Sequence, residues 1–197
     1  RVICGVESNF AKSILEKLYR PLNLRETPIL FAKRETAELI KYASNGFLAT
    51  KITFINEMAD ICEKVGADIQ EVAKGIGLDG RIGSKFLHPG PGFGGSCFPK
   101  DTRALSEIGK EVGAKSQIID SVIEVNESRK INMVKKIKDT LEPLTNKSLS
   151  ILGLTFKPNT DDMRESPSLI IVPELVKMTK EVKVYDQKEF DPASILT

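Results

Sequence analysis

The chain has 197 residues, of which 29 are lysine or arginine and 27 are aspartate or glutamate, so its formal net charge is only +2. This balance gives no support for a nucleic-acid or membrane-surface partner, because such functions concentrate basic residues. No apolar run in the sequence approaches the ~20 residues that a membrane span needs. We therefore expect a globular protein that binds neither nucleic acid nor membrane.

The sequence contains three cysteines, Cys4, Cys62 and Cys97, and one histidine, His88. An odd number of scattered cysteines does not form a disulfide framework, which indicates a reducing compartment and hence a cytoplasmic location. A single histidine excludes a histidine-based metal site, and no metal is expected.

The first segment, residues 1–34, is predicted to form a strand, a helix and a second strand. Apolar residues open it at 2–6, Ser8 is a candidate helix cap, and another apolar run follows at 28–31. A two-stranded sheet is rarely a complete domain. The chain also begins without methionine and ends eleven residues after a predicted strand at 182–186. These features indicate a fragment of a longer protein.

Residues 35–65 predict the dominant element, a helix of roughly 45 Å that ends before Gly66. Its apolar residues recur at helical spacing and are expected to form one buried stripe. The stripe consists of Ile40, Ala43, Phe47, Phe54, Ile55, Met58, Cys62 and Val65. A helix of this length is expected to cross a subunit or domain boundary.

Two polar residues on this helix, Lys41 and Asn45, lie four apart and therefore on one flank. That flank is half apolar, so the pair is either a candidate functional pair or a lysine and an asparagine on a mixed surface. Lys51 falls inside the apolar stripe, which suggests a contact with a partner chain or a ligand. A shorter helix follows, with the capping pair Asp68 and Glu71 at its start.

The stretch at residues 90–101 is a glycine-rich loop that leads into a predicted helix at 99–113. Ser96 is the candidate cap, so Cys97 lies at the helix N-terminus, where the helix dipole favours a thiolate. Asp101 lies one turn further on the same face and could hold a water or exchange a proton. This pattern is typical of covalent catalysis followed by hydrolysis. The alternative is a buried structural cysteine.

Two glycine sets have the spacing of a dinucleotide-binding loop, namely Gly75, Gly77 and Gly80, and Gly90, Gly92 and Gly95. That motif requires a buried strand immediately before it, whereas a helix precedes the first set and a loop precedes the second. Neither set is therefore interpreted as a phosphate-binding fingerprint.

The remainder predicts a long helix at 116–141 with a polar middle at 124–130, which is typical of a connector between domains. A strand, a helix and a strand then form a parallel βαβ unit. The loop at 156–166 follows the first of these strands, where α/β sheets place ligands, and its Lys157 and Arg164 could meet phosphate or carboxylate groups. A solvated connection with balanced charges is the alternative.

With these pieces assembled, the sequence resembles the nucleotide-sugar dehydrogenases of the UDP-glucose/GDP-mannose dehydrogenase family. The resemblance covers essentially the whole chain in order and rests on four motifs. These are ELIKYASN at 38–45, RIGSKFL at 81–87, GGSCFPKD at 94–101, and the loop from FK at 156–157 to RES at 164–166.

The resemblance implies an NAD-dependent, two-step oxidation of a sugar CH₂OH group to a carboxylate, and the stretch at 81–83 favours the UDP-glucose branch. It implies that Cys97 is the nucleophile, which forms a thiohemiacetal and then a thioester. It further implies that Lys41 and Asn45 stabilise the oxyanion and that Asp101 positions the hydrolytic water.

The same resemblance implies contacts with the nucleotide sugar and the cofactor. The residues implied to contact the UDP-sugar are Phe86, Phe93, Gly94 and Lys157. Arg81 is implied to reach the substrate of the neighbouring subunit, and Arg164 to approach NAD.

The expected fold is a mainly α-helical dimerisation domain with a long core helix, flanked by partial α/β segments. Residues 1–34 would be the end of an NAD-binding domain, 35–125 the helical domain, 126–147 a linker helix, and 148–197 the start of a Rossmann-like, UDP-binding domain. Because the NAD-binding fingerprint is absent, we expect the 197-residue chain alone to be inactive.

Two other readings stay open. The sugar nucleotide could be GDP-mannose or a UDP-N-acetylhexosamine. Alternatively, the chain could be a non-catalytic helical module that dimerises through the helix at 35–65.

Overall fold

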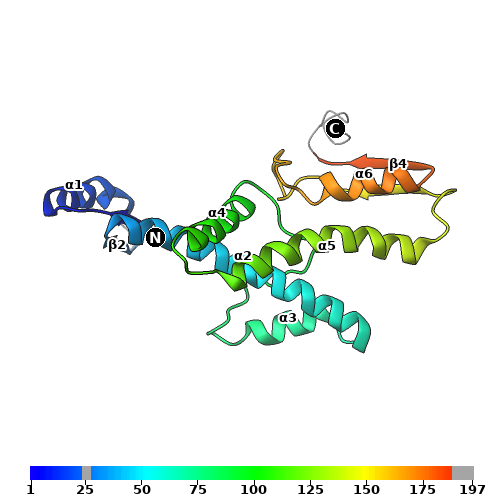
Figure 1. The fold of residues 1–197 in the computed structure, drawn as a ribbon, viewed down its shortest axis with the longest axis horizontal. Helices are drawn as coiled ribbons and strands as arrows, with labels where there is room; N and C mark the ends of the chain where they lie inside the picture. The colour runs from blue at the N-terminus through cyan, green and yellow to red at the C-terminus, as the bar shows by residue number, and fades with distance from the viewer. Residues whose placement is uncertain (24–27, 188–197) are drawn as a thin grey trace. The chain divides into compact units, whose positions relative to one another are not determined.

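The computed structural model describes residues 1–23 and 28–187 (Figure 1). The chain divides into two compact units, Arg1–Asn45 and Gly46–Thr197, and the division falls inside helix α2. The domain limits expected near residues 34, 125 and 147 stay a prediction, and residues 188–197 of the last expected domain lie outside the described residues.

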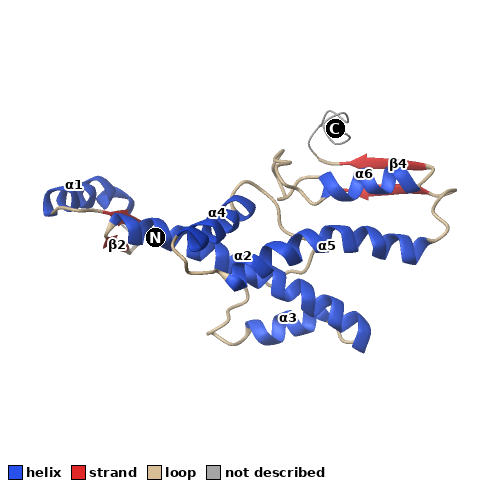
Figure 2. Cartoon of the chain, in the orientation of Figure 1, coloured by secondary structure: helices blue, strands red, loops and turns tan. Residues whose placement is uncertain are grey.

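The first unit contains the predicted strand, helix and strand (Figure 2). Strand β1 (Val2–Gly5) pairs in parallel with β2 (Ile29–Ala32), and helix α1 (Asn9–Tyr19) with the 3₁₀ turn η1 (Arg20–Asn23) connects them. The hydroxyl of Ser8 accepts a hydrogen bond of 3.2 Å from the N–H of Ala11. The predicted cap of this helix is therefore confirmed.

Helix α2 spans Arg34–Val65, as the periodicity predicts, but part of the predicted apolar stripe is exposed. Ile55 and Cys62 are buried, whereas Phe47 is 66% and Phe54 47% exposed. The buried side of α2 instead carries small and polar residues such as Ala49 and Asn56. Small side chains let the neighbouring elements approach α2 closely. The buried face of α2 is therefore the one that packs closely, not the one with the largest apolar side chains.

Helix α3 (Ile69–Gly77) packs against α2 through a core of Ile55, Ala73 and Leu87. The carboxylate of Asp68 accepts hydrogen bonds from the N–H groups of Gln70 and Glu71, so the predicted cap is confirmed. A loop from residue 78 to 97 connects α3 to helix α4 (Phe98–Glu111).

Helix α5 (Gln117–Leu141) packs beside α4 and continues to the C-terminal βαβ unit. Strands β3 (Ser148–Leu152) and β4 (Glu181–Tyr185) are parallel, and helix α6 (Ser168–Met178) connects them and runs through Pro173. The core of this part joins Val134 of α5 to Ile171 and Leu175 of α6. The mainly α-helical fold with partial α/β segments is therefore confirmed.

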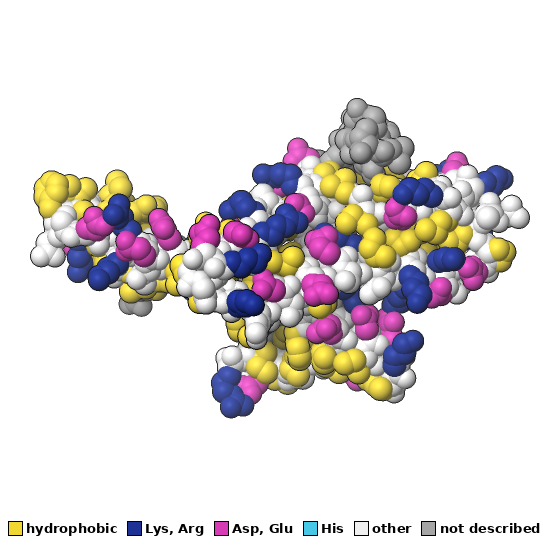
Figure 3. Space-filling view, in the orientation of Figure 1, with side chains coloured by type: hydrophobic (Ala, Val, Ile, Leu, Met, Phe, Trp, Pro, Cys, Tyr) yellow, Lys and Arg dark blue, Asp and Glu magenta, His cyan; other side chains and the backbone are white. Residues whose placement is uncertain are grey.

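The surface view in Figure 3 shows acidic and basic side chains interspersed over the visible face. Such mixing agrees with the balanced composition and gives this face no single-sign charge field. Within the described residues, none of the helices is both long and apolar enough to cross a bilayer.

Candidate active site

Cys97 is the N-cap residue of α4, and its side chain is exposed. Both Cys4 and Cys62 are buried, so Cys97 is the cysteine that a substrate can reach. Its carbonyl oxygen accepts a hydrogen bond of 2.8 Å from the N–H of Asp101, which closes the first helical turn. The free N–H groups of that turn create a positive field at the sulfur.

The predicted role of Ser96 as the helix cap is wrong, because the N-cap position is Cys97 and no side chain there bonds to the helix backbone. The Ser96 hydroxyl instead lies 3.7 Å from the sulfur of Cys97. Ser96 therefore contacts the side chain of Cys97 rather than the helix backbone.

Asp101 lies one turn beyond Cys97 and is only 1% exposed. The ammonium of Lys100, which is exposed, contacts its carboxylate. A buried carboxylate is retained where charged or polar partners compensate for its lost hydration. The structure thus brings an exposed thiol and a buried carboxylate to the same end of α4.

Two asparagines and an arginine from neighbouring helices fix the glycine loop. Asn56 of α2 accepts the Gly90 N–H at 2.7 Å, and Arg129 of α5 donates to the Gly90 carbonyl at 2.7 Å. Asn126 accepts from the Phe93 N–H at 2.8 Å and donates to the Phe93 carbonyl at 3.2 Å. The polar middle of α5, which the sequence suggests to be a connector between domains, therefore also fixes the glycine loop.

Three aromatic rings form a row at the first residue of α4, Phe98, which follows Cys97 in the chain. The rings of Phe86 and Phe93 each meet Phe98 edge to face, with centroids 6.0 Å apart. Phe86 has a φ of 65°, which is unusual for a bulky residue and typical of positions that the surroundings hold in place. Two of the residues implied to contact the sugar nucleotide are thus adjacent to α4.

The second half of the site is the loop between β3 and α6. The N–H of Gly95 donates to the carbonyl of Arg164 at 2.7 Å. A Cβ on Gly94 would lie 2.3 Å from the carbonyl oxygen of Glu165, and one on Gly95 would lie 2.6 Å from the ring of Phe156. Only glycine permits this approach, so the two loops meet backbone to backbone.

The guanidinium of Arg164 is held by Asp162, which accepts hydrogen bonds of 2.8 Å and 2.6 Å. These bonds raise the pKa of Arg164, and a weaker electrostatic interaction with Cys97 acts in the same direction. The same pairing lowers the pKa of Asp162 to about 2. Arg164 therefore stays charged within electrostatic reach of the sulfur.

The other predicted site residues lie on exposed loops or on helix α2. Lys157 is exposed in the β3–α6 loop, and the Thr160 hydroxyl donates to its carbonyl at 2.8 Å. Arg81 is exposed and forms an ion pair of 2.6 Å with Asp79. Lys41 and Asn45 lie in α2 within the first unit, so their approach to Cys97 stays a prediction.

Lys51 now has a structural explanation. Its ammonium donates to the carbonyls of Ile82 and Gly83, at 3.0 Å and 3.2 Å. The sequence suggested a partner chain or a ligand, but Lys51 holds the loop that carries Arg81.

Two cavities among the described residues do not have Cys97 in their lining. One of about 620 Å³ is lined by residues at the end of α5 and of α6, and one of about 260 Å³ lies between α2 and α5. Within the same described part of the chain, no group of three or more His, Cys, Asp or Glu could hold a metal ion.

Comparison with known proteins identifies the family. The sequence model of the UDP-glucose/GDP-mannose dehydrogenase central domain matches residues 35–128, and that of the UDP binding domain of the same family matches residues 150–193. The chain belongs to the UDP-glucose/GDP-mannose dehydrogenase family. The two matches together include α2, the glycine loop, Cys97 and Arg164.

Relatives within this family agree with the assignment. A UDP-glucose 6-dehydrogenase of Rhizobium meliloti is 49% identical over 98% of this chain and 45% of its own length. A UDP-glucose dehydrogenase of Pyrobaculum islandicum has a TM-score of 0.88 at 36% identity, over 98% of this chain and 48% of its own. The UDP-D-ManNAc dehydrogenase of Pyrococcus horikoshii follows with a TM-score of 0.79 at 28% identity, over 98% and 46%. This chain thus spans about half the length of these relatives.

Proposed function

We propose that the protein carrying this chain oxidises UDP-glucose to UDP-glucuronate with NAD in two steps, through a covalent intermediate on Cys97. The observation that carries the proposal is the exposed Cys97 at the start of α4, one helical turn from the buried Asp101. A hydrolysing, covalent mechanism needs this combination of a nucleophile and a nearby carboxylate.

The proposed reaction consists of two oxidations followed by the hydrolysis of a thioester. The first oxidation removes a hydride and a proton from the CH₂OH group, and the sulfur of Cys97 adds to the resulting aldehyde carbon. Loss of a second hydride, with the hydroxyl proton, converts this thiohemiacetal to a thioester. Water held by Asp101 then gives a proton to that carboxylate and adds to the thioester carbon, the C–S bond breaks, sulfur leaves as the thiolate, and the carboxylic acid formed releases its proton to solvent.

Other residues have supporting roles in this proposal. Lys41 and Asn45 would donate hydrogen bonds to the oxyanion that develops at the sugar carbon. The residues that would bind the UDP-sugar are Arg81, Phe86, Phe93, Gly94 and Lys157. The expected location is the cytoplasm.

NAD, when bound, accepts the hydride in each oxidation. Arg164 fits such a cofactor, because its guanidinium is exposed, permanently charged and in electrostatic reach of Cys97. An exposed guanidinium in the turn that precedes α6 is suited to the phosphate oxygens of a dinucleotide.

We further propose that α2 mediates homodimerisation. Six residues of this helix follow the a and d positions of a heptad pattern, namely Phe47, Lys51, Phe54, Met58, Ile61 and Val65. Phe47, Phe54, Ile61 and Val65 are exposed, and a heptad stripe is typical of a helix that packs against a second helix. A second copy of the chain would cover these side chains.

The test uses the full-length protein that contains this sequence. We expect two NADH per UDP-glucose, and a loss of more than about a thousandfold in kcat for Cys97→Ala. Cys62→Ala is the control, because it removes a buried thiol outside the site. Activity that survives Cys97→Ala would refute the covalent mechanism.

The same assay tests two kinds of alternative, namely another sugar nucleotide as substrate and a chain without catalytic activity. The likeness to the Pyrococcus protein makes a UDP-N-acetylhexosamine the second candidate substrate, and GDP-mannose the third. A higher kcat/KM with either sugar nucleotide would replace UDP-glucose in the proposal. Absence of NADH with all three would favour a non-catalytic helical module.

A further inference from the structure

The backbone of Glu165 is in the left-handed region, with a φ of 55°. This conformation is unfavourable for a residue with a side chain and persists only where the surroundings determine it. Glu165 follows Arg164 directly, and the peptide between them carries the oxygen that accepts the Gly95 N–H. Because the two residues share this peptide, the backbone conformation of Glu165 helps to fix the position of Arg164.

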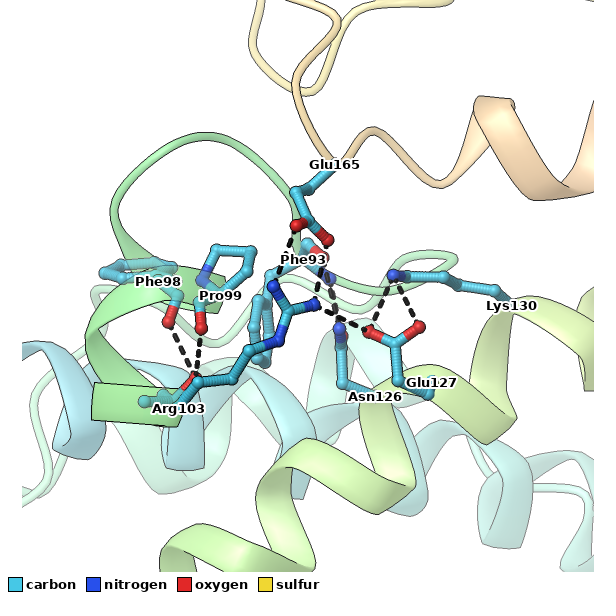
Figure 4. Close-up of polar contacts among 9 residues, drawn as sticks. Phe93, Phe98, Pro99, Arg103, Asn126, Glu127, Lys130 and Glu165 are labelled. Atoms are coloured by element: carbon cyan, nitrogen blue, oxygen red, sulfur yellow. Dashed lines mark hydrogen bonds and ion pairs between the residues drawn. The ribbon is translucent and has the colours of Figure 1, made fainter. Parts of the chain in front are cut away.

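The side chain of Glu165 is clamped by Arg103 of α4 (Figure 4). The two guanidinium nitrogens of Arg103 donate to the two carboxylate oxygens at 2.8 Å and 3.0 Å. This bidentate geometry restrains direction as well as distance, which a single bond does not. Arg103 comes from the same helix that begins at Cys97, so the clamp connects the nucleophile's helix to the β3–α6 loop.

Arg103 is itself held on its other side. Glu127 of α5 lies 4.0 Å from Arg103 and accepts two hydrogen bonds from Lys130, at 2.9 Å and 3.0 Å. Lys130 is only 2% exposed, so its ammonium is a fixed charge rather than a mobile surface group. Figure 4 shows the alternation of charge from Glu165 through Arg103 and Glu127 to Lys130.

We propose that Arg103 is a positioning residue of the active site. By clamping Glu165, it fixes the peptide between Arg164 and Glu165 against Gly95, two residues before Cys97, and thereby sets the position of the Arg164 guanidinium relative to the sulfur. The effect on the reaction rests on the proposed function, in which Arg164 meets the cofactor. The effect on the charge at Cys97 does not depend on that function.

The first experiment measures the charge beside Cys97 in the full-length protein without substrate. Iodoacetate is an anion and iodoacetamide is neutral, so the ratio of their alkylation rates at Cys97 reports the field of Arg164. We expect Arg164→Met to lower this ratio about fivefold, and Arg103→Met to lower it to a similar extent. Lys110→Met is the matched control, because it breaks the Lys110–Glu107 pair on α4 and should leave the ratio unchanged.

The second experiment measures NADH production. Arg103→Met is expected to raise the KM for NAD about five- to tenfold with a smaller change in kcat, since the mutation displaces a binding group rather than the nucleophile. Arg103→Lys retains the charge but loses the bidentate geometry, so we expect it to restore only part of the KM and of the alkylation ratio.

The outcomes distinguish the two proposals. If no sugar nucleotide is oxidised, the proposed function fails, but the alkylation ratio still tests the clamp. If Arg103→Met keeps the ratio of the wild-type protein, the clamp is a surface ion pair without a positioning role. An equal fall in Lys110→Met, or no fall in Arg164→Met, would also overturn the inference.

Discussion

The N–H of Gly95 donates a hydrogen bond of 2.7 Å to the carbonyl oxygen of Arg164, a residue 69 positions later in the chain. This bond joins the glycine loop that leads to Cys97 to the loop between β3 and α6. The candidate site in this unit is therefore built from two segments that are distant in the sequence but in contact through their backbones.

The closeness of these loops gives a prediction at Gly94. Gly94→Ala would place a Cβ 2.3 Å from the carbonyl oxygen of Glu165, so the loops must separate. We expect a loss of about 1–3 kcal/mol in the free energy of unfolding, measured by urea titration, and a lower NADH production rate. Gly90→Ala is the control, because a Cβ there meets nothing within 4 Å. Equal stability of the two variants would contradict the close approach.

Asn126 provides a second test, at the base of the glycine loop. Asn126→Ala leaves the buried N–H and carbonyl of Phe93 without their partner. We expect the free energy of unfolding to fall by about 2–4 kcal/mol in urea titrations, because unsatisfied buried polar groups are costly. Asn132→Ala, at an exposed position of the same helix, should change it by less than about 0.5 kcal/mol. A small effect of Asn126→Ala would show that water replaces the side chain.

The hydrogen bonds of Lys51 are expected to keep the loop that carries Arg81 closed. Lys51→Met removes the hydrogen bonds to the carbonyls of Ile82 and Gly83, so the loop should open more often. We expect faster tryptic cleavage after Arg81, detected by mass spectrometry of the fragments. Lys64→Met, near the end of the same helix, should leave the cleavage rate unchanged.

The pKa of Glu165 predicts a pH dependence for its clamp. The hydrogen bonds from Arg103 lower this pKa, against the opposing effect of burial. A carboxyl group with a lowered pKa stabilises the folded state above its ordinary pKa, and this contribution is lost as the pH falls through the lowered value. The clamp should therefore be intact at neutral pH and release in acid.

The measurement for this prediction is the carboxyl titration of Glu165 by NMR. Its midpoint should lie higher in Arg103→Met than in the wild-type protein. Glu63 is the control. A hydrogen bond with Lys136 lowers its pKa, and Arg103→Met leaves that bond in place, so the midpoint of Glu63 should be the same in both proteins. Coincident midpoints for Glu165 would mean that the ion pair does not persist in solution.

The exposed heptad stripe of α2 predicts the oligomeric state. Phe54→Glu would place a charge at the centre of the proposed helix–helix contact, so we expect the dimer dissociation constant to rise more than about tenfold. Sedimentation velocity over a concentration series measures this constant. Val112→Glu, at another exposed apolar position, should leave it unchanged. Unaltered assembly of Phe54→Glu would assign the dimer contact to another surface.

The sequence predicted long, regular elements well, because their signals are local. The helices at 34–65 and 117–141, and the parallel βαβ unit, follow from periodicity and turn residues. The periodicity predicts Phe47 and Phe54 in the core stripe, but both are exposed, because periodicity alone does not distinguish a buried face from an exposed apolar face. Their spacing of seven residues was the available signal.

Contacts between distant residues were not predictable in the same way. Arg103 and Glu165 are 62 positions apart, and Asn126 and Phe93 are 33 apart. Nothing in the spacing of such pairs marks them, because their proximity depends on how three helices and two loops pack. Cys97 and Asp101 could be paired from the sequence only because one helical turn separates them.

Helix α5 has its buried residues at intervals of four, namely Val122, Asn126, Lys130 and Val134. Asn126 fixes the glycine loop, whereas Val134 packs into the core of the βαβ unit. Insertion or deletion of one residue between them would turn everything downstream by about 100° and carry one of these contacts off its face. Length changes in this fold can therefore accumulate in loops, but the segment from Asn126 to Val134 must keep its number of residues.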